Sequence, residues 1–238
     1  MFDIKKYISG IFVGSMLITS ANAQEFNFDY SEDIYLKFYT GFNDIQDQGM
    51  NESSSFAGVT VNADYEWGFE TGWTVGTILG YPLFDPSIPF FGNLRGEVDA
   101  SYSKAYADDI DGSVTLTGDD ESVTISGSAE VNGKVEIVDF YNNFIFNVRD
   151  YNIVQPYFGL GIGFSYIEHN VEDIAGEVFG IMEKDTSIGV QFVLGADLFA
   201  SNNFSGGARI VGRQVSNSRE GVDSVQALGG QFDIRYNF

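Results

Sequence analysis

The chain of 238 residues contains no cysteine and a single histidine. Disulfides therefore cannot stabilise it, although small secreted domains usually depend on them. Zinc sites need cysteines or several histidines, so the sequence lacks the residues for such a site. Lysine and arginine together number only 12, against 34 aspartates and glutamates. Because nucleic-acid binding needs basic side chains to neutralise phosphates, this balance argues against a nucleic-acid partner.

Long apolar runs are also missing beyond the N-terminus, where no stretch of eighteen apolar residues could form a membrane-spanning helix. At the N-terminus, two lysines precede an apolar run over 7–18, and Ala21 and Ala23 form a small-residue cleavage site. This order predicts a secretory signal peptide over 1–23 and a mature chain over 24–238. The run is too short for a membrane anchor.

The last fifteen residues show period-two alternation, with apolar side chains on one face and polar ones on the other from Gln231 onward, and end on an aromatic residue. A strand of a soluble, sugar-binding β-sandwich can also alternate in this way, and such a protein is one alternative. An exposed terminal Phe238 suits a strand whose outward face meets lipid and whose inward face is polar. The apolar set at the end of this strand is Phe232, Ile234, Tyr236 and Phe238.

Seven further segments alternate in the same way and are separated by alternately short and long connections. Short periplasmic turns and long outer loops are typical of transmembrane β-barrels. The sequence therefore predicts an all-β fold, an eight-stranded antiparallel up-and-down transmembrane β-barrel with both ends in the periplasm. The predicted strands lie near 34–42, 69–81, 94–103, 135–148, 156–167, 186–199, 204–215 and 224–238.

Residues 59–66 alternate as well. We interpret them as an extension of the second strand above the membrane, and an extra strand pair within 56–67 is the alternative. The long connections 43–66, 107–133, 167–185 and 216–223 hold twenty acids and two bases. We expect them to be solvated, mobile outer loops, with divalent cations that bridge them to lipid headgroups as candidate partners.

The polar faces of the predicted strands carry five acids and five bases. Buried charges persist only where they are paired and hydrogen-bonded, so a balanced set predicts an internal ion-pair network. An eight-stranded barrel is just wide enough for side chains to fill it, which predicts a plugged interior. The ten residues are Lys37, Arg95, Glu97, Asp99, Asp139, Asp197, Arg209, Arg213, Asp233 and Arg235.

Aromatic residues lie where the predicted strands enter and leave the membrane. Trp73 and Tyr81 share one face of a strand and are eight residues apart, which corresponds to about 21 Å along a tilted strand. Barrels of this kind carry aromatic girdles at both edges of an apolar band. The predicted girdle residues are Trp73, Tyr81, Phe84, Phe90, Phe91, Phe204, Tyr236 and Phe238.

Three segments resemble a known family. The sequences GWTVGTILGY over 72–81 and NLRGEVDASY over 93–102 resemble the second and third strands of the opacity-like outer-membrane β-barrel and surface-antigen family. That family in turn resembles the membrane domain of OmpA-type proteins. The sequence QPYFGLGIG over 155–163 looks like its glycine-rich fifth strand, and the aromatic C-terminus looks like its assembly signal. The resemblance implies an eight-stranded barrel whose members are surface antigens, adhesins or structural proteins.

Two glycine and aspartate motifs suggest ligand binding but fit poorly. The GLGIG segment over 159–163 is followed by Phe164 and no helix, so it does not form a dinucleotide loop. Its glycines face inward, where neighbouring tyrosine and arginine side chains need space. The DIDG segment over 109–112 hints at a calcium loop, but Ala107 and Gly118 occupy positions where an EF-hand needs acidic ligands. A weak cation site remains an alternative among Asp108, Asp109, Asp111, Asp119, Asp120 and Glu121.

The only histidine, His169, follows Glu168 at the predicted end of the fifth strand. Barrel hydrolases use a histidine with Ser or Asp near the outer rim. No His-x-Ser pattern occurs here, and we therefore expect a solvent-exposed rim histidine without a catalytic role.

These observations together predict a bacterial outer-membrane protein with a structural, surface-antigen or adhesin-like role. We expect no catalysis, no cofactor and no metal site. The expected partners are outer-membrane lipid and, through the C-terminal strand, the outer-membrane assembly machinery; the sequence does not identify an extracellular ligand. A small-solute porin or channel is the first functional alternative, and a lipid-modifying barrel enzyme is the second.

Overall fold

The computed structural model describes residues 34–46, 48–56, 59–84, 91–117, 122–148, 154–174, 177–199, 203–216 and 224–238. The predicted signal peptide and Phe90 lie outside these residues. No helix in this part of the chain is long and apolar enough to cross a membrane. The strands are β1 (Tyr35–Ile45), β2 (Gln48–Phe56), β3 (Val59–Phe69), β4 (Gly72–Phe84), β5 (Phe91–Thr117), β6 (Ser122–Val148), β7 (Val154–Ile174), β8 (Glu177–Phe199), β9 (Phe204–Val215) and β10 (Val225–Asn237).

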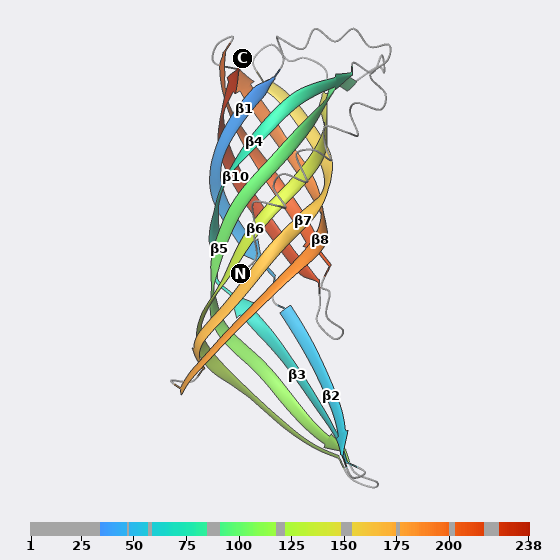
Figure 1. Cartoon of the computed structure of the whole chain (residues 1–238), viewed down its shortest axis with the longest axis vertical. Helices are drawn as coiled ribbons and strands as arrows, with labels where there is room; N and C mark the ends of the chain where they lie inside the picture. Colours follow the sequence, from blue (N-terminus) through green and yellow to red (C-terminus); the bar gives the residue numbers. More distant parts are fainter. Residues whose placement is uncertain are drawn as a thin grey trace. The chain divides into compact units, whose positions relative to one another are not determined.

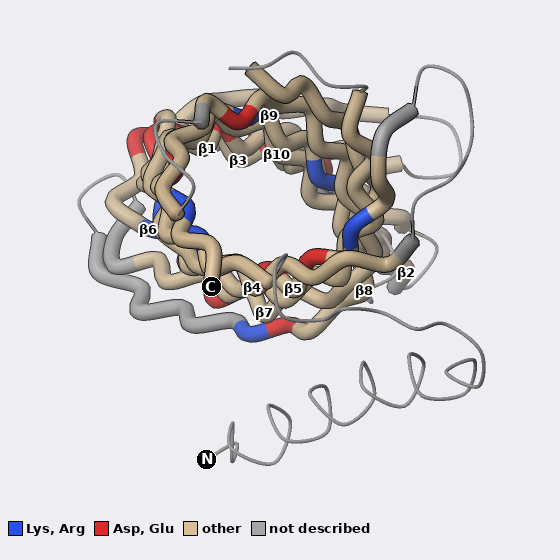
Figure 2. Tube along the Cα trace, turned by 90° about the horizontal axis from the view of Figure 1, so that it is seen from above, with Lys and Arg blue, Asp and Glu red and all other residues tan. Residues whose placement is uncertain are grey.

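Eight of these strands form a closed antiparallel ring (Figures 1 and 2). The order around the ring is β1, β4, β5, β6, β7, β8, β9 and β10, and β10 pairs again with β1. The closing pair runs from Tyr35 opposite Asn237 to Ile45 opposite Ala227. The predicted eight-stranded up-and-down barrel is therefore confirmed. Closure leaves no free edge within the ring, which is the condition for strands to cross a bilayer.

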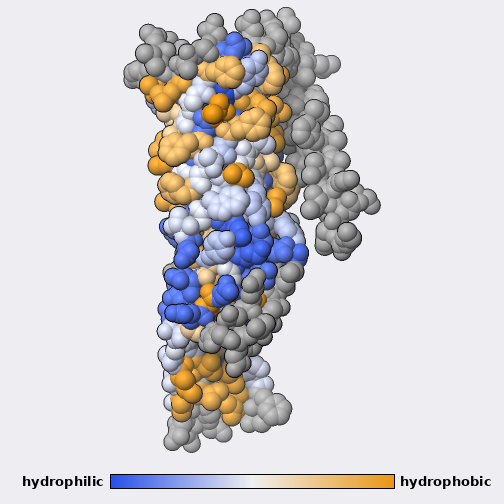
Figure 3. Space-filling view, turned by 90° about the vertical axis from the view of Figure 1, so that its left-hand side faces the viewer, coloured by the Kyte–Doolittle hydropathy of each residue, from blue (hydrophilic) through white to orange (hydrophobic). Residues whose placement is uncertain are grey.

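Alternate residues along each ring strand face the interior and the exterior. On β6, every second residue from Val131 to Asn147 is buried, while the residues between them are partly or well exposed. The exterior set is apolar and forms the orange areas in the upper half of Figure 3. Such a surface meets lipid rather than water. Its most exposed members include Phe38, Phe144, Leu160, Ile188, Leu194, Ile210, Phe232 and Ile234.

Four ring strands are much longer than predicted. Strands β5 and β6 have 27 residues each, β7 has 21 and β8 has 23. The predicted loops 107–133 and 167–185 are therefore wrong for their described residues, which continue the strands beyond the apolar band. The reason is visible in the sequence: Val114, Leu116, Val123 and Ile125 continue the period-two alternation among threonines and serines, which suit strands.

Strands β2 and β3 lie outside the ring and pair with each other. Strand β3 also pairs with β5, from Thr60 opposite Thr117 to Phe69 opposite Ala107. Strand β4 pairs with the next part of β5, starting at Trp73 opposite Lys104. Residues 59–69 thus extend the line of β4 along β5, as predicted. Strand β2 was not predicted, because it lies within the predicted loop 43–66 and almost wholly outside the 56–67 range of the alternative, so that loop is wrong for its described residues. We call β2, β3, residues 107–117 of β5 and 122–131 of β6 the distal lobe.

Candidate functional sites in the barrel interior and on the distal lobe

All ten predicted interior charges lie inside the ring, and their centre is the carboxylate of Asp197. Its Oδ1 lies 2.6 Å from Lys37 Nζ. Its Oδ2 lies 3.1 Å from Arg95 Nη1 and 3.2 Å from Arg235 Nη1. Both Lys37 and Asp197 are fully buried. One carboxylate from β8 therefore joins bases from β1, β5 and β10 across the barrel.

A second group of ion pairs lies around two arginines of β9. Arg209 Nη2 lies 2.9 Å from Asp99 Oδ2, and Arg213 donates to Asp139. Glu97 lies between the two groups: Arg95 Nε is 3.4 Å from its Oε1 and Arg209 Nη1 is 4.0 Å from its Oε2. Eight of the ten interior charges therefore form one chain of contacts, and Arg213 and Asp139 form a separate pair beside it. Figure 2 shows charged positions distributed around the wall of the ring.

Neutral side chains complete this network. Arg209 Nε donates to Gln231 Oε1 at 2.5 Å, and Arg213 Nε donates to Gln191 Oε1 at 3.1 Å. Asp139 also accepts hydrogen bonds from Ser101 and Ser165. Asp233 is less well satisfied, because its closest base, Lys37, is 3.6 Å away and both carboxylate oxygens lack a hydrogen-bond partner among the described residues. Of the five acids, Asp233 is the one that needs a bridging water.

Buried tyrosines contact both the acids and the bases of the interior, a role that was not predicted from the sequence. Tyr35 donates to Glu97, and Tyr39 donates to Asp99 Oδ1 at 2.7 Å. The guanidinium of Arg235 lies 3.7 Å from the ring centroid of Tyr35, and that of Arg209 lies 4.4 Å from that of Tyr39. Such cation–π contacts favour a desolvated arginine. The only sequence signal for these tyrosines is that they share the inward face with the charges.

Inward glycines make room for these rings. Among the glycines of 159–163, only Gly163 lies against a tyrosine, Tyr141, while Gly159 lies against Ile145 and Gly161 against Asn143 and Gln191. A Cβ on Gly80 would lie 1.9 Å from the ring of Tyr35, and one on Gly76 would lie 2.4 Å from that of Tyr39. A Cβ on Gly195 would likewise meet Tyr157 at 2.6 Å. Real Cβ atoms do not approach other atoms so closely, and these positions therefore need glycine. The glycines of the ring strands serve packing, and no nucleotide site is needed to explain them.

An apolar layer closes the interior towards the distal lobe. It lies where β1 and β9 end and β10 begins. Tightly packed apolar side chains at this point separate the charged interior from the lobe. The sequence reasoning expected a polar interior throughout and missed this layer. Its buried members are Ile45, Ala105, Val135, Ile137, Ile167, Val215, Val225 and Ala227, with Phe69 packed against them.

The predicted girdle residues whose side chains are described lie on the exterior of the ring. Trp73 is exposed and packs on Tyr102 with ring centroids 5.4 Å apart. At the opposite end, Tyr236 contacts both Phe204 and Phe238, at 5.1 and 5.3 Å between centroids. Tyr81 is half-buried. The side chains of Phe84 and Phe91 lie outside the described residues.

The C-terminal strand β10 presents its apolar set to the exterior. Phe232, Ile234, Tyr236 and Phe238 are all exposed, while the intervening Gln231 and Asp233 are buried. The backbone of Phe238 donates to Ile34 O at 3.0 Å, so the pairing with the N-terminal side of the ring extends to the last residue.

On the distal lobe the polarity of the two faces is reversed. Trp67, Phe69 and Ile110 pack against buried Ala107 and Val131, which continue the inner face of the barrel. The inner face of the lobe is therefore apolar. Its outer face continues the lipid-facing exterior of the ring but carries polar and acidic side chains. A β-bulge between Ala107 and Asp109 accompanies this change.

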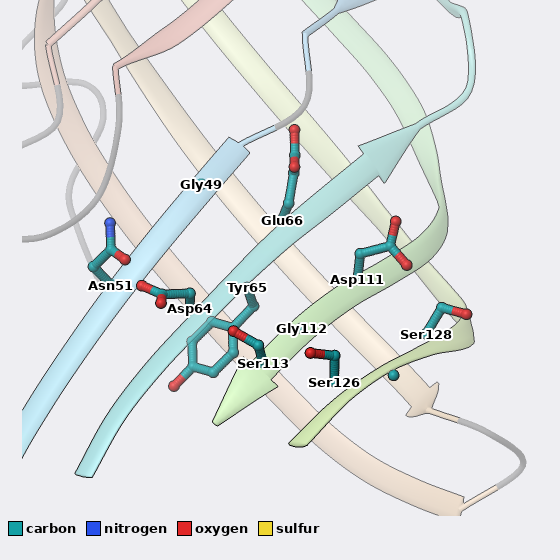
Figure 4. Close-up of a pocket in the computed structure, with 11 residues that line it drawn as sticks. Gly49, Asn51, Asp64, Tyr65, Glu66, Asp111, Gly112, Ser113, Ser126 and Ser128 are labelled. Carbon is teal, nitrogen blue, oxygen red and sulfur yellow. The ribbon is translucent and has the colours of Figure 1, made fainter. Parts of the chain in front are cut away.

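A shallow trough of about 640 Å³ lies on the outer face of the lobe (Figure 4). Register places Glu66, Asp111 and Ser128 in one row along its side. Asp64 and Ser113 belong to the second row. In the part of the chain that the structure describes, no group of three or more His, Cys, Asp or Glu side chains is arranged to hold a metal ion. The divalent-cation partner therefore gains no support from the lobe.

The remaining motif residues have structural positions that differ from expectation. Asp109 and Asp111 lie within strand β5, so the segment does not form a calcium loop, and Asp119, Asp120 and Glu121 lie outside the described residues. His169 is half-buried on β7, with its ring centroid 6.5 Å from that of Phe69. The predicted solvent-exposed rim histidine is therefore wrong, because the longer β7 carries this residue into the wall above the apolar layer.

Comparisons with known proteins agree with the fold. The structure of Neisserial surface protein A is similar, with 15% identity, a TM-score of 0.51, and coverage of 86% of this chain and 97% of that one. The outer-membrane protein OprG of Pseudomonas aeruginosa is 14% identical with a TM-score of 0.48, and the match covers 88% of this chain and 97% of OprG. The protease OmpT of Escherichia coli is 9% identical with a TM-score of 0.48, and the match covers 90% of this chain and 99% of OmpT. No protein-family model and no curated sequence matches the chain. The chain has the fold of a bacterial outer-membrane β-barrel, and the narrower resemblance to the opacity-like family stays a prediction.

Proposed function

We propose that this chain is an outer-membrane surface protein that anchors a recognition element, the distal lobe, on a closed barrel. In this role it acts as a surface antigen, an adhesin or a stabiliser of the envelope, without catalysis. The observation that carries the proposal is the contrast between a filled, ion-paired interior and strands that continue well beyond the apolar band. A protein that only conducted solutes would need an open interior in place of a filled one.

The interior argues against an open pore. An eight-stranded ring is just wide enough for side chains to fill it. Here arginines, carboxylates and tyrosines fill the middle, and the apolar layer lies above them. Water and ions would have to displace buried, paired charges to pass, which costs several kcal/mol for each ion.

The surroundings of His169 argue against a hydrolase. Its ring packs near Phe69 on the inner side of the wall, where a lipid substrate outside the barrel has no direct access. A catalytic histidine must lie within hydrogen-bond reach of the proton that it transfers. We therefore assign His169 a packing role.

The remaining partners follow from the exterior. The apolar ring surface contacts outer-membrane lipid, and the exposed aromatic end of β10 is the element that the assembly machinery recognises. The ten buried charges have a structural role and hold the strands in register. In this proposal the signal peptide is cleaved after Ala23, and the mature chain begins at Gln24.

Planar-bilayer conductance tests the closed barrel. We expect the refolded protein to show no steady openings under conditions in which a porin, inserted in the same membrane, conducts. Steady openings of porin size would contradict the proposal and favour the small-solute channel. A change in lipid A turnover between the wild type and His169→Ala would instead favour the lipid-modifying enzyme.

A further inference from the structure

One edge of the distal lobe is an unpaired strand. Residues 122–130 of β6 pair with β5 on one side, and pairing with β7 begins only at Val131 opposite Ile174. Among the described residues, the other side of this nine-residue stretch therefore has free backbone N–H and C=O groups. Natural proteins usually blunt such edges with lysine, proline or a bulge. The stretch SVTISGSAE contains no lysine and no proline, and its pairing with β5 is regular.

The two faces of this edge have different chemistry. Val123 and Ile125 lie on the inner face, where they are 55% and 68% exposed. Val114 and Leu116 of the neighbouring β5 extend this patch, which lies over the tip of the lobe at the bottom of Figure 3. Exposed apolar patches of this kind mark sites of interaction. The opposite face at the edge carries only serine, threonine and Glu130.

The lobe is also strongly acidic. Its described residues include Glu52, Asp64, Glu66, Asp108, Asp109, Asp111 and Glu130, and they contain no lysine or arginine. On the outer face, Asp111 pairs with Ser128 in register and lies one strand from the free edge. A strand added at this edge would place every second side chain over the acidic face and the others over the apolar patch.

We propose that the free edge of β6 binds an extended segment of another protein in which apolar and basic residues alternate. The segment adds a fifth strand to the lobe: its backbone pairs with 122–130, its apolar residues cover Val123 and Ile125, and its basic residues lie towards Asp111 and Glu130. This is recognition by strand addition, in which the backbone provides affinity and the side chains provide specificity. The inference rests on the proposed function and names the class of partner for the lobe.

Two other arrangements fit the charges less well. A second copy of this chain would bring two acidic lobes together, and like charges oppose that contact. Strand β2 pairs only with β3 among the described residues and so gives the lobe a second edge, but it has Glu52 and Ser54 on the apolar face, which interrupts the alternation that an amphipathic segment needs. The edge of β6 has no such interruption between Val123 and Ala129.

Labelled nine-residue peptides test the proposal on the full-length protein in detergent or nanodiscs, with fluorescence anisotropy as the readout. The first peptide alternates lysine and valine, the second alternates glutamate and valine, and the third has the composition of the first with its lysines and valines in separate blocks. We expect the first to bind at least ~10-fold more tightly than the others. In a strand, the N–H groups of alternate residues point to the same edge. N-methylation of the residues whose N–H groups face β6 should therefore abolish binding, and N-methylation of the intervening residues should leave binding intact.

Two substitutions locate the site. Ile125→Ser should weaken binding of the first peptide about 10-fold, because one apolar side chain is no longer covered. The matched control is Val59→Ser, on the same face but two strands away, and it should leave binding unchanged. Glu130→Gln should weaken binding of the lysine peptide, while Glu52→Gln at the other edge should not. Heat-modifiability on detergent gels checks that each variant remains a folded barrel.

Equal binding of the alternating and block peptides would overturn the inference, because it would show attraction by charge alone. Absence of binding by the first peptide would also overturn it. Self-association of the purified protein that Ile125→Ser abolishes would identify a second copy as the occupant and likewise overturn it. None of these results affects the proposed closed barrel, whose own test is conductance, and a conducting barrel that still binds the peptide would refute only the proposed function.

Discussion

Strands β5 and β6 pass through two regions in which the same alternation has opposite meaning. In the ring, the residues that face outward are apolar and those that face inward are charged. In the distal lobe, the inner face carries Val114 and Ile125 and the outer face carries Asp111 and Ser128. The difference teaches that the surroundings decide which face is apolar: lipid surrounds the ring, whereas water surrounds the lobe.

The ring and the distal lobe also differ in how their charged side chains are compensated. The ring buries five acids with five bases, and contacts join almost all of them. The lobe exposes acids without bases. Buried charges must be compensated within the protein, whereas exposed charges are compensated by water and ions. Substitutions in one region should therefore have large effects, and equivalent substitutions in the other should have small ones.

The largest effect is expected at Asp197. Asp197→Ala leaves Lys37, Arg95 and Arg235 buried without their shared carboxylate, and should lower the free energy of unfolding by about 3–5 kcal/mol. Urea unfolding of the protein refolded in phospholipid vesicles, followed by the fluorescence of Trp67 and Trp73, measures this change. Glu66→Ala on the exposed face of the lobe is the control and should stay within about 0.5 kcal/mol. Equal losses for both variants would remove the distinction between the regions.

The next effect concerns the outward faces. Leu194 lies on the exterior of β8 between Ile188 and Leu198, and Leu194→Arg should cost about 2–4 kcal/mol because it places a charge in the lipid band. Thr117→Arg, on the outward polar face of the lobe, should change stability by no more than about 0.5 kcal/mol. The same vesicle unfolding experiment compares them. A larger loss for Thr117→Arg would mean that the assigned lipid-facing surface is wrong.

A smaller difference in stability is expected between alanine substitutions at two strand glycines, Gly80 in the ring and Gly127 in the lobe. Gly80→Ala should cost about 1–3 kcal/mol, because the new Cβ collides with the ring of Tyr35. Gly127→Ala in the lobe meets no atom within 4 Å and should be neutral or stabilising by up to about 1 kcal/mol. In a Tyr35→Ala background, Gly80→Ala should cost less than in the wild type. Persistence of the full cost there would point to backbone strain instead of a ring collision.

The smallest effect is expected at Glu136, on the outward face of β6 above the apolar band. Hydrogen bonds from Lys134 and Tyr102 lower the pKa of Glu136. A lowered carboxyl pKa stabilises the fold at neutral pH, and this contribution is lost as the pH falls below about 4. Because the pair is partly exposed to solvent, Glu136→Gln should cost only about 0.2–1 kcal/mol at pH 7. The difference between variant and wild type should vanish in unfolding measurements at about pH 2–3, and a constant difference would exclude the ion pair as its cause.

Local patterns allowed much of the fold to be predicted, and their failures have a common cause. The ring strands and the inward position of all ten charges followed from period-two alternation. Strand ends were poorly predicted, because Thr, Ser and Asp at 107–117 and 122–130 occur in solvated strands as readily as in loops. The orientation of His169 and the role of Tyr35 were missed because both depend on neighbours distant in the sequence.

By itself, the sequence determined that alternate residues of each strand face lipid and interior, because the side chains of a strand must point to opposite faces. The sequence also determined that the interior acids and bases are equal in number, because this depends only on which residues face inward. Only the tertiary structure decided that Asp197 joins three bases, that Gly80 receives the ring of Tyr35, and that no other described strand pairs with the edge of β6 at 122–130. These features arise between strands far apart in the chain, and the register that brings them together is a property of the closed ring.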